Sequence, residues 1–221
     1  MPKVTEEYII NKKKMITDAA FELCVEKTVS TVTMQDIINR TGLSQGGIYR
    51  FYHDIDEIFA DMLAEMKKKF CIKDKVDEIF AQADDIPVGE VMNCIFDMLT
   101  IFLSEELMEI EKVDFELYVL SMNAPKRVAK ILKGANGVGN KEYILFRTSE
   151  FLKQKIESGE VHAKVDGTEL LKYMASAYSG IQTNCIVNHC YHKATMSEFY
   201  KPKEQIQILA KTVNYLLGVD E

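Results

Sequence analysis

The chain has 221 residues and a formal net charge of −7, from 27 Lys and Arg against 34 Asp and Glu. This acidic balance argues against a general nucleic-acid coater, and no apolar run reaches the roughly 18 residues that a membrane span needs. Few prolines and glycines among many Leu, Ile, Met, Lys and Glu predict an all-α protein. Five cysteines without framework spacing, and an N-terminus without a signal-peptide layout, favour the cytoplasm and no membrane partner.

The first predicted helix covers about residues 6–27. Its apolar face comprises Ile9, Ile16, Ala19, Ala20, Leu23 and Cys24. Three lysines at residues 12–14 lie in the middle of this helix. They are explained equally well by a solvent-exposed helix face and by contact with a DNA backbone. Residues 1–50 carry seven Lys and Arg against six Asp and Glu, whereas residues 51–221 carry 20 against 28. A near-neutral head on an acidic body is compatible with DNA binding confined to the head.

The next segment predicts two short helices, a tight turn and the start of a longer helix. Thr33, with Asp36 three residues later, resembles a capping box. Gly42 tolerates the left-handed backbone of a sharp turn, and Ser44 can cap the helix that follows. This is the layout of a helix-turn-helix, whose second helix, here extending to about Tyr52, enters the major groove of DNA.

Further helices are predicted over about residues 54–80, 88–104, 105–122, 126–133, 141–157, 167–191 and 203–217. Asp54 and Glu57 resemble another capping box at the start of the first of these helices. Pro87 follows the end of that helix, because proline cannot sit in a helix interior. Residues 134–140 contain three glycines and are the clearest loop in the chain.

These elements resemble the tetracycline-repressor (TetR) family of bacterial one-component regulators over about residues 12–60. The positions that match the three blocks of the family pattern are, in order, Ile16, Ala19, Ala20, Leu23 and Cys24, then Thr33, Ile37, Gly42, Leu43 and Ser44, then Tyr49, Tyr52 and Ile58. Three positions depart from the pattern. Thr28 replaces a glycine, Ile38 replaces a small residue, and Ile55 replaces the lysine that in the family typically reaches a DNA phosphate.

The resemblance implies an all-α fold of about nine helices and a homodimer. We expect an N-terminal three-helix DNA-binding head with the helix-turn-helix over residues 1–53. A larger C-terminal helical domain for ligand binding and dimerisation is expected over residues 54–221. Dimerisation is expected through the last two helices as a four-helix bundle, where Ala175, Ser179 and Gly180 permit close approach. No cofactor is implied.

Nine residues are candidates for contact with double-stranded DNA: Thr33, Gln35, Ser44, Gln45, Gly46, Gly47, Tyr49, Arg50 and His53. Gln45 can bond an adenine edge in bidentate fashion, for roughly 1–3 kcal/mol of discrimination. Gly46 and Gly47 either admit close approach of the backbone to DNA or only loosen the turn.

The remaining candidates carry two interpretations each. By family position Tyr49 contacts a phosphate, although packing against the first helix would explain it equally well. Arg50 can take a phosphate or a guanine. Because Ile55 removes an expected cation, backbone contact should be weaker, and Arg50 or His53 could compensate. Thr33 can cap its helix and also donate to a phosphate, so its two roles do not compete.

Apolar and aromatic residues between 88 and 181 predict either ordinary helical core or the wall of a ligand pocket. The candidates for ligand contact are Met92, Phe96, Phe115, Tyr118, Met122, Phe151, Met174 and Tyr178. The family resemblance favours a pocket for an apolar or amphipathic small molecule.

The sequence therefore predicts a ligand-responsive DNA-binding regulator, a repressor that a small molecule releases from a near-palindromic operator. One alternative is a ligand-sensing helical dimer with weak or lost DNA binding, which Ile55 favours. A second is a helical enzyme that uses Cys185, His189 and His192, whose spacing suits a thiol–imidazole zinc site. Because one helix supplies only half of such a site and nothing orients a Cys–His pair, we predict neither a metal site nor a catalytic residue.

Overall fold

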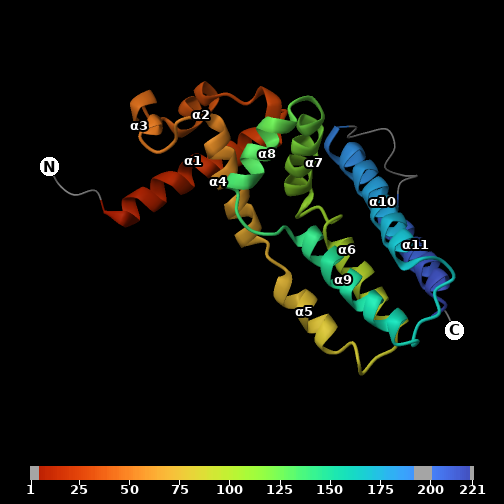
Figure 1. Ribbon diagram of the computed structural model, residues 1–221. Helices are drawn as coiled ribbons and strands as arrows, with labels where there is room; N and C mark the ends of the chain where they lie inside the picture. The colour runs from red at the N-terminus through yellow and green to blue at the C-terminus, as the bar shows by residue number, and fades with distance from the viewer. Residues whose placement is uncertain (1–4, 192–200, 220–221) are drawn as a thin grey trace. The chain divides into compact units, whose positions relative to one another are not determined.

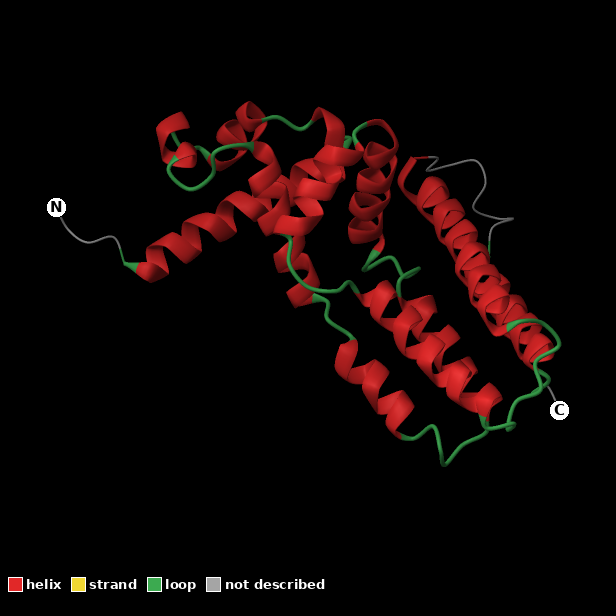
Figure 2. Cartoon of the chain, viewed as in Figure 1, coloured by secondary structure: helices red, strands yellow, loops and turns green. Residues whose placement is uncertain are grey.

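The computed structural model describes residues 5–191 and 201–219. Within these ranges every regular element is a helix and no strand occurs (Figures 1 and 2), in agreement with the predicted all-α class. Among the described helices, none is long and apolar enough to cross a membrane. The chain forms two compact units, which we call unit 1 (Met1–Phe70 and Lys112–Gly137) and unit 2 (Cys71–Glu111 and Val138–Glu221).

Unit 1 contains the helix-turn-helix. Its helices are α1 (Glu6–Glu26), the 3₁₀ turn η1 (Val29–Thr31), α2 (Met34–Thr41), α3 (Gln45–Tyr49), α4 (Ile55–Lys69), most of α7 (Met108–Asn123) and α8 (Pro125–Gly134). α1 packs against α2 and α4, and α4 packs against α8. Ile16 of α1 and Phe59 of α4 are completely buried at the centre of this packing. The hydrophobic core of unit 1 is therefore built around α1 and α4.

Unit 1 extends well beyond the domain predicted for residues 1–53. Val113 and Leu117 of α7 and Ile131 of α8 are buried in the same cluster as Ile48 of the helix-turn-helix. A domain of about 50 residues buries only a modest fraction of its apolar surface, and these later helices add to it. The compact units change at Phe70/Cys71, within α7 at Glu111/Lys112, and at Gly137/Val138, and none of these points coincides with the border predicted after residue 53.

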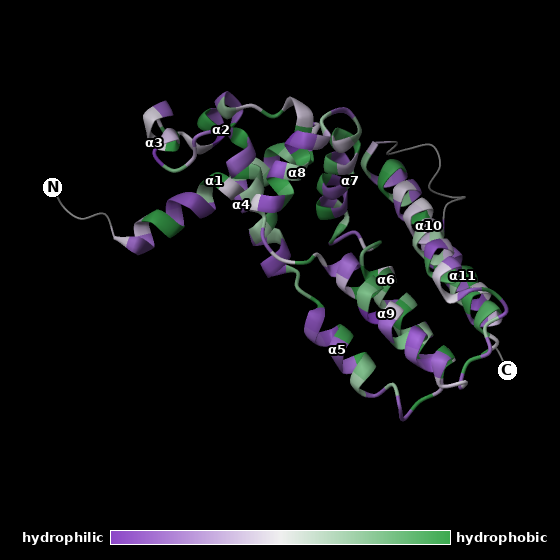
Figure 3. Cartoon of the chain, in the orientation of Figure 1, coloured by the Kyte–Doolittle hydropathy of each residue, from purple (hydrophilic) through white to green (hydrophobic). Residues whose placement is uncertain are grey.

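Unit 2 is a second helical assembly. Its helices are α5 (Lys73–Ala81), α6 (Val88–Ile101), the first turn of α7, α9 (Asn140–Glu157), α10 (Gly167–Ile186), the π-helical turn η2 (Val187–Tyr191) and α11 (Pro202–Leu217). α11 packs against α6 and α10, and α9 packs against α5 and α10. α6 is hydrophobic along much of its length (Figure 3), with Met92, Ile95 and Phe96 at most 1% exposed, so it forms the centre of this core.

The single helix predicted over residues 54–80 is wrong. α4 ends at Lys69, α5 begins at Lys73, and Phe70 between them has a non-helical backbone (φ −115°, ψ 32°). The N–H of Ile72 donates to Oδ1 of Asn140, 68 residues later, at 3.2 Å. A tertiary hydrogen bond therefore replaces a helical one, and neither glycine nor proline announces the break in the sequence.

Two other helix ends differ from prediction. α3 stops at Tyr49, and the next residues tighten into a turn in which the N–H groups of Phe51 and Tyr52 both donate to the Ile48 carbonyl. The helix predicted to reach residue 191 is regular only to Ile186 and then widens into the π-helical turn η2. The other predicted helices agree within a few residues at each end.

Candidate nucleic-acid interface

The helix-turn-helix is held by caps close in sequence. The Thr33 hydroxyl accepts from the Asp36 N–H at 3.2 Å, while the Asp36 carboxylate accepts from the Thr33 N–H at 2.8 Å. This reciprocal pair is the predicted capping box. Gly42 ends α2 in the left-handed region (φ 66°), and the Ser44 hydroxyl accepts from the Gly47 N–H at 3.1 Å to cap α3. The predicted turn and both predicted caps are confirmed.

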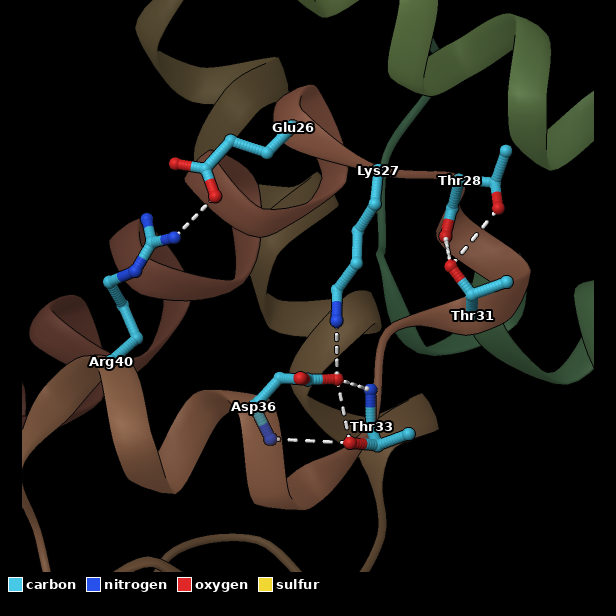
Figure 4. Close-up of polar contacts among 7 residues, drawn as sticks. All are labelled: Glu26, Lys27, Thr28, Thr31, Thr33, Asp36 and Arg40. Carbon is cyan, nitrogen blue, oxygen red and sulfur yellow. Dashed lines mark hydrogen bonds and ion pairs between the residues drawn. The ribbon is translucent and has the colours of Figure 1, made fainter.

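Ion pairs join α1 to α2 (Figure 4). Lys27 Nζ lies 2.7 Å from Asp36 Oδ2, and Arg40 bridges to Glu22 and Glu26 on α1. The bond from Lys27 is the main reason that the pKa of Asp36 falls to about 2, and the Thr33 bonds add to it. Asp36 therefore stays charged across the physiological range and ties the start of α2 to the end of α1. The sequence indicated the capping role of Asp36 but not its ion pair.

Most of the predicted DNA contacts lie on an exposed surface. Thr33, Gln35, Ser44, Gln45, Gly46, Tyr49, Arg50 and His53 are exposed, and Gly47 is half-buried. The Gln35 amide donates to Asn39 Oδ1 at 2.9 Å, so DNA would have to compete with that bond. Tyr49 is 42% exposed, whereas Ile48 and Tyr52, close to it in the sequence, are buried. α3 thus presents a polar face outward and anchors itself by an apolar one.

The two adjacent glycines of α3 differ in their surroundings. A Cβ atom placed on Gly46 would meet nothing within 4 Å, whereas one on Gly47 would lie 3.1 Å from the Ser44 hydroxyl. Gly47 therefore protects the cap of α3. Gly46 has no such role within the protein, and its missing side chain leaves open surface.

A polar trio fixes the end of the motif to α4. The Tyr52 hydroxyl donates to Asp61 Oδ2 at 2.9 Å, and Lys13 Nζ pairs with the same oxygen at 2.9 Å. Lys13 also lies over the Tyr52 ring, 4.9 Å from its centroid. Burial, together with the charge on Asp61, raises the pKa of Tyr52, so the phenol remains a donor. Lys13, one of the three lysines at 12–14, is thereby engaged inside unit 1.

Ile55, the main departure from the family pattern, is half-buried at the first position of α4 and packs against the unit 1 core. The acids on either side of it are paired with α8. Asp54 Oδ2 lies 2.9 Å from Lys130 Nζ, and Asp56 Oδ1 lies 2.8 Å from Arg127 Nε. At the start of α4, the position where the family pattern has a lysine is therefore occupied by an apolar residue, and the acids on either side of it are ion-paired.

Replacing Ile55 with lysine is expected to strengthen DNA binding. An added phosphate contact steepens the slope of log K against log salt by about 0.9, because roughly one more counterion is released. Fluorescence anisotropy with operator DNA over a KCl series measures this slope. Ile55→Met, which has a similar volume and no charge, serves as the control and should leave the slope unchanged. An Ile55→Lys slope equal to that of the wild type would show that this position lies away from the phosphates.

The predicted ligand residues are divided between the units. Met92, Phe96, Phe151, Met174 and Tyr178 are buried in unit 2. Phe115 is half-buried in unit 1, where Tyr118 and Met122 are 62% and 63% exposed. The Tyr178 hydroxyl donates to the Leu99 carbonyl at 3.2 Å, so its polar end is already satisfied. The five buried candidates therefore all belong to unit 2, and the other three belong to unit 1.

Two grooves are found among the described residues of unit 2. One, of about 790 Å³, lies between α5 and α9 and is lined by Phe80, Arg147 and Phe151, among others. The other, of about 920 Å³, lies between α6 and α11 and includes Phe96 and Asn214 in its wall. Phe96 and Phe151, predicted to line one pocket, thus line different grooves.

The cluster behind the enzyme alternative gives no reactive thiol. Burial, with smaller contributions from Cys190 and Glu111, raises the pKa of Cys185 to about 11, so its sulfur is protonated at neutral pH. His192 lies outside the described residues. Within residues 5–191 and 201–219, no three His, Cys, Asp or Glu side chains are grouped to hold a metal ion.

A capped helix-turn-helix with an exposed polar face, set on a packed helical unit, defines a DNA-binding regulatory protein. Residues 16–62 match the model of the bacterial regulatory proteins of the tetR family. The chain is 23% identical over 214 residues, covering 96% of both sequences, to an uncharacterised HTH-type transcriptional regulator, YfiR, of Bacillus subtilis (strain 168). Residues 16–62 are therefore a tetR-family DNA-binding segment, and the chain as a whole is similar to transcriptional regulators of this family.

Solved structures share the whole fold at low identity. A TetR transcription regulator from Haloarcula marismortui aligns over 94% of this chain and 97% of its own, with a TM-score of 0.62 and 15% identity. The regulator FadR from Bacillus subtilis, solved in complex with stearoyl-CoA, aligns over 90% of this chain and 96% of its own, with a TM-score of 0.59 and 16% identity. The likeness thus extends to both units.

Proposed function

We propose that this regulator represses transcription as a homodimer on a near-palindromic operator and is released by a small molecule. The observation that carries the proposal is the two-sided α3. Ile48 of α3 and Tyr52 of the following turn are buried, whereas Gln45, Tyr49 and Arg50 are exposed. These exposed residues are the proposed contacts to bases and phosphates. Unit 1 contains 15 Lys and Arg against 13 Asp and Glu, whereas unit 2 contains 12 Lys and Arg against 21 Asp and Glu. An anionic partner such as DNA is therefore expected to bind unit 1 rather than unit 2.

Features of α10 and α11 support a dimer through these helices. Tyr173, Ile208 and Tyr215 are 45%, 64% and 54% exposed although they are large and apolar. Gly180 on α10 has open space where a Cβ would be, which admits close approach of a second helix. A two-fold dimer presents two α3 helices, and its preferred DNA is therefore close to palindromic.

The proposed effector is an apolar or amphipathic molecule bound in unit 2. Met92, Phe96, Met174 and Tyr178 supply the apolar surroundings, and stearoyl-CoA, bound by the FadR of similar fold, is an amphipathic ligand. A ligand shifts the equilibrium only if it binds one state more tightly, so the DNA-free state is the one that holds it better. Reciprocity then requires operator DNA to weaken ligand binding by the same factor.

The experiment begins with selection of binding sites from random duplex DNA by the purified protein. Anisotropy titrations follow, with the selected duplex and with a scrambled duplex of equal composition. We expect a two-fold symmetric consensus and salt-dependent, sequence-specific binding. Binding that is equally weak for both duplexes favours the alternative of a ligand-sensing dimer without DNA binding, for which Ile55 is the motivating residue. Native mass spectrometry of the same preparation detects a co-purified effector and the dimer.

Gly46→Ala is expected to leave the fold intact and to weaken operator binding. Alanine in a helix is more favourable than glycine by about 1 kcal/mol, and nothing in the protein obstructs the added methyl group. If the α3 backbone approaches the DNA closely at this point, the methyl group keeps it away. Thermal unfolding should be unchanged or slightly higher while the selected duplex binds less tightly. Undiminished binding would favour the interpretation that Gly46 only loosens the turn.

A further inference from the structure

A buried ion pair on α7 lies at the junction of α1 and η1. Lys112 and Glu116 are one helical turn apart, with Nζ and Oε1 separated by 3.4 Å, and their side chains are 8% and 7% exposed. Both residues belong to unit 1. Charged side chains are almost never buried this deeply unless they meet specific partners.

Partners of this pair include backbone groups of the DNA-binding segment. Lys112 Nζ donates to the carbonyls of Cys24 at 2.8 Å and Lys27 at 3.4 Å, which lie at the end of α1. Glu116 Oε2 accepts from the Val29 N–H at 2.7 Å, at the start of η1. The Lys112 ammonium group thus binds carbonyls at the C-terminal end of α1, and the Glu116 carboxylate binds an N–H at the N-terminal end of η1.

At the start of η1 no neighbouring side chain takes the capping role of Glu116, although Lys27 also pairs with Asp36 of α2. The residue before η1, Thr28, makes no side-chain cap to it, and its hydroxyl bonds to Thr31 instead (Figure 4). Glu116, 87 residues away in sequence, does the capping. Cys24 and Val29, whose backbone groups meet this pair, are both completely buried, and burial raises the pKa of the Cys24 thiol to about 12. Only three residues separate Val29 from Thr33, the N-cap of α2.

We infer that Lys112 and Glu116 are positioning residues for DNA binding, because they fix the α1–η1 corner from which α2 and α3 are oriented toward the DNA. The inference rests on the proposed function. A buried ion pair contributes little net stability compared with apolar side chains of the same size, yet it demands one geometry. Loss of the ion pair should therefore lower the affinity for operator DNA even in a variant whose stability is recovered.

The test is the double variant Lys112→Met/Glu116→Gln. Lys112→Met alone leaves a buried carboxylate without its counter-charge and should lower the Tm. Adding Glu116→Gln removes that charge but keeps an acceptor for the Val29 N–H, so the Tm should recover most of the loss. Affinity for the selected duplex should remain about tenfold weaker than that of the wild type. Affinity for the scrambled duplex and the salt slope should not change, since no phosphate contact is removed.

Lys155→Met is the matched control. Lys155 is 6% exposed on α9 of unit 2 and pairs with Asp84 and Glu160, so it is a lysine of equal burial outside unit 1. Its loss should lower the Tm and leave operator affinity unchanged at equal dimer concentration. If the double variant fails to fold, Glu116→Gln alone replaces it, with several-fold weaker operator binding and unchanged scrambled-duplex binding expected.

The outcomes separate this inference from the proposed function. Wild-type affinity of the double variant for the selected duplex, at recovered stability, overturns the inference while the proposed function stands. A parallel fall for both duplexes also overturns it, because orientation of the motif would then not be the cause. Failure of the wild type to prefer any selected duplex contradicts the proposed function and the inference together.

Discussion

Tyr49→Ala/Arg50→Ala is expected to weaken operator binding strongly and to leave the free energy of unfolding almost unchanged. Both side chains are exposed beside the buried Ile48, so their removal creates no cavity. A lost base contact costs about 1–3 kcal/mol, and a lost phosphate contact weakens binding to all sequences. If the two losses are of similar size, affinity falls by roughly 30-fold or more, at 1.4 kcal/mol for each factor of ten.

Anisotropy with the selected duplex, together with sedimentation to establish that the dimer persists, measures this effect. The control is Lys67→Ala/Lys68→Ala, which removes two positive charges from the same unit. At 1.5 Å per residue these lysines lie roughly 20 Å along α4 from its start, and the control should bind nearly as the wild type does. Equal losses in the two variants would mean that net charge, rather than the α3 face, governs binding.

The parts of this interface that could be predicted are those held by neighbours in sequence. The capping box of Thr33 and Asp36 spans three residues, and the turn depends on the backbone freedom of Gly42. Such features leave a spacing pattern in the chain. The resemblance to one family depended on the same local blocks, and the match over residues 16–62 coincides with them.

The parts that could not be predicted depend on distant partners. Asp61 meets Lys13 across 48 residues, and the break after α4 depends on a bond from Ile72 to Asn140. No periodicity encodes such pairs. Asp54 and Asp56, on either side of Ile55, pair with Lys130 and Arg127 of α8, more than 70 residues away, which no local pattern predicted.

The ligand residues illustrate a different limit. An apolar stripe at helical spacing predicts which face of a helix is buried, but it does not identify the cavity that the face adjoins. Met92 and Met174 are buried as the stripe requires. Tyr118 and Met122 are also large and largely apolar, yet they are mostly exposed, whereas Val113 and Leu117 of the same helix are buried.

Ile48→Ala is expected to have the largest effect on the stability of the helix-turn-helix. Ile48 is completely buried at the middle of α3, and its carbonyl accepts from two N–H groups of the following turn. Removing buried methylene groups from such a site costs about 2–5 kcal/mol, which includes the cavity left behind. A helix as short as Gln45–Tyr49 has little stability of its own, so it depends on this side chain.

Because α3 carries the proposed contacts, its local unfolding should weaken operator binding before the whole unit unfolds. Denaturant unfolding measures the global loss, and hydrogen exchange of residues 45–52 measures the local one. Ile10→Ala, at a side chain 58% exposed on α1, removes the same atoms from the surface and should change stability by no more than about 0.5 kcal/mol. Full operator affinity in Ile48→Ala, despite fast exchange across α3, would mean that DNA contact does not require α3 to be ordered in the free protein.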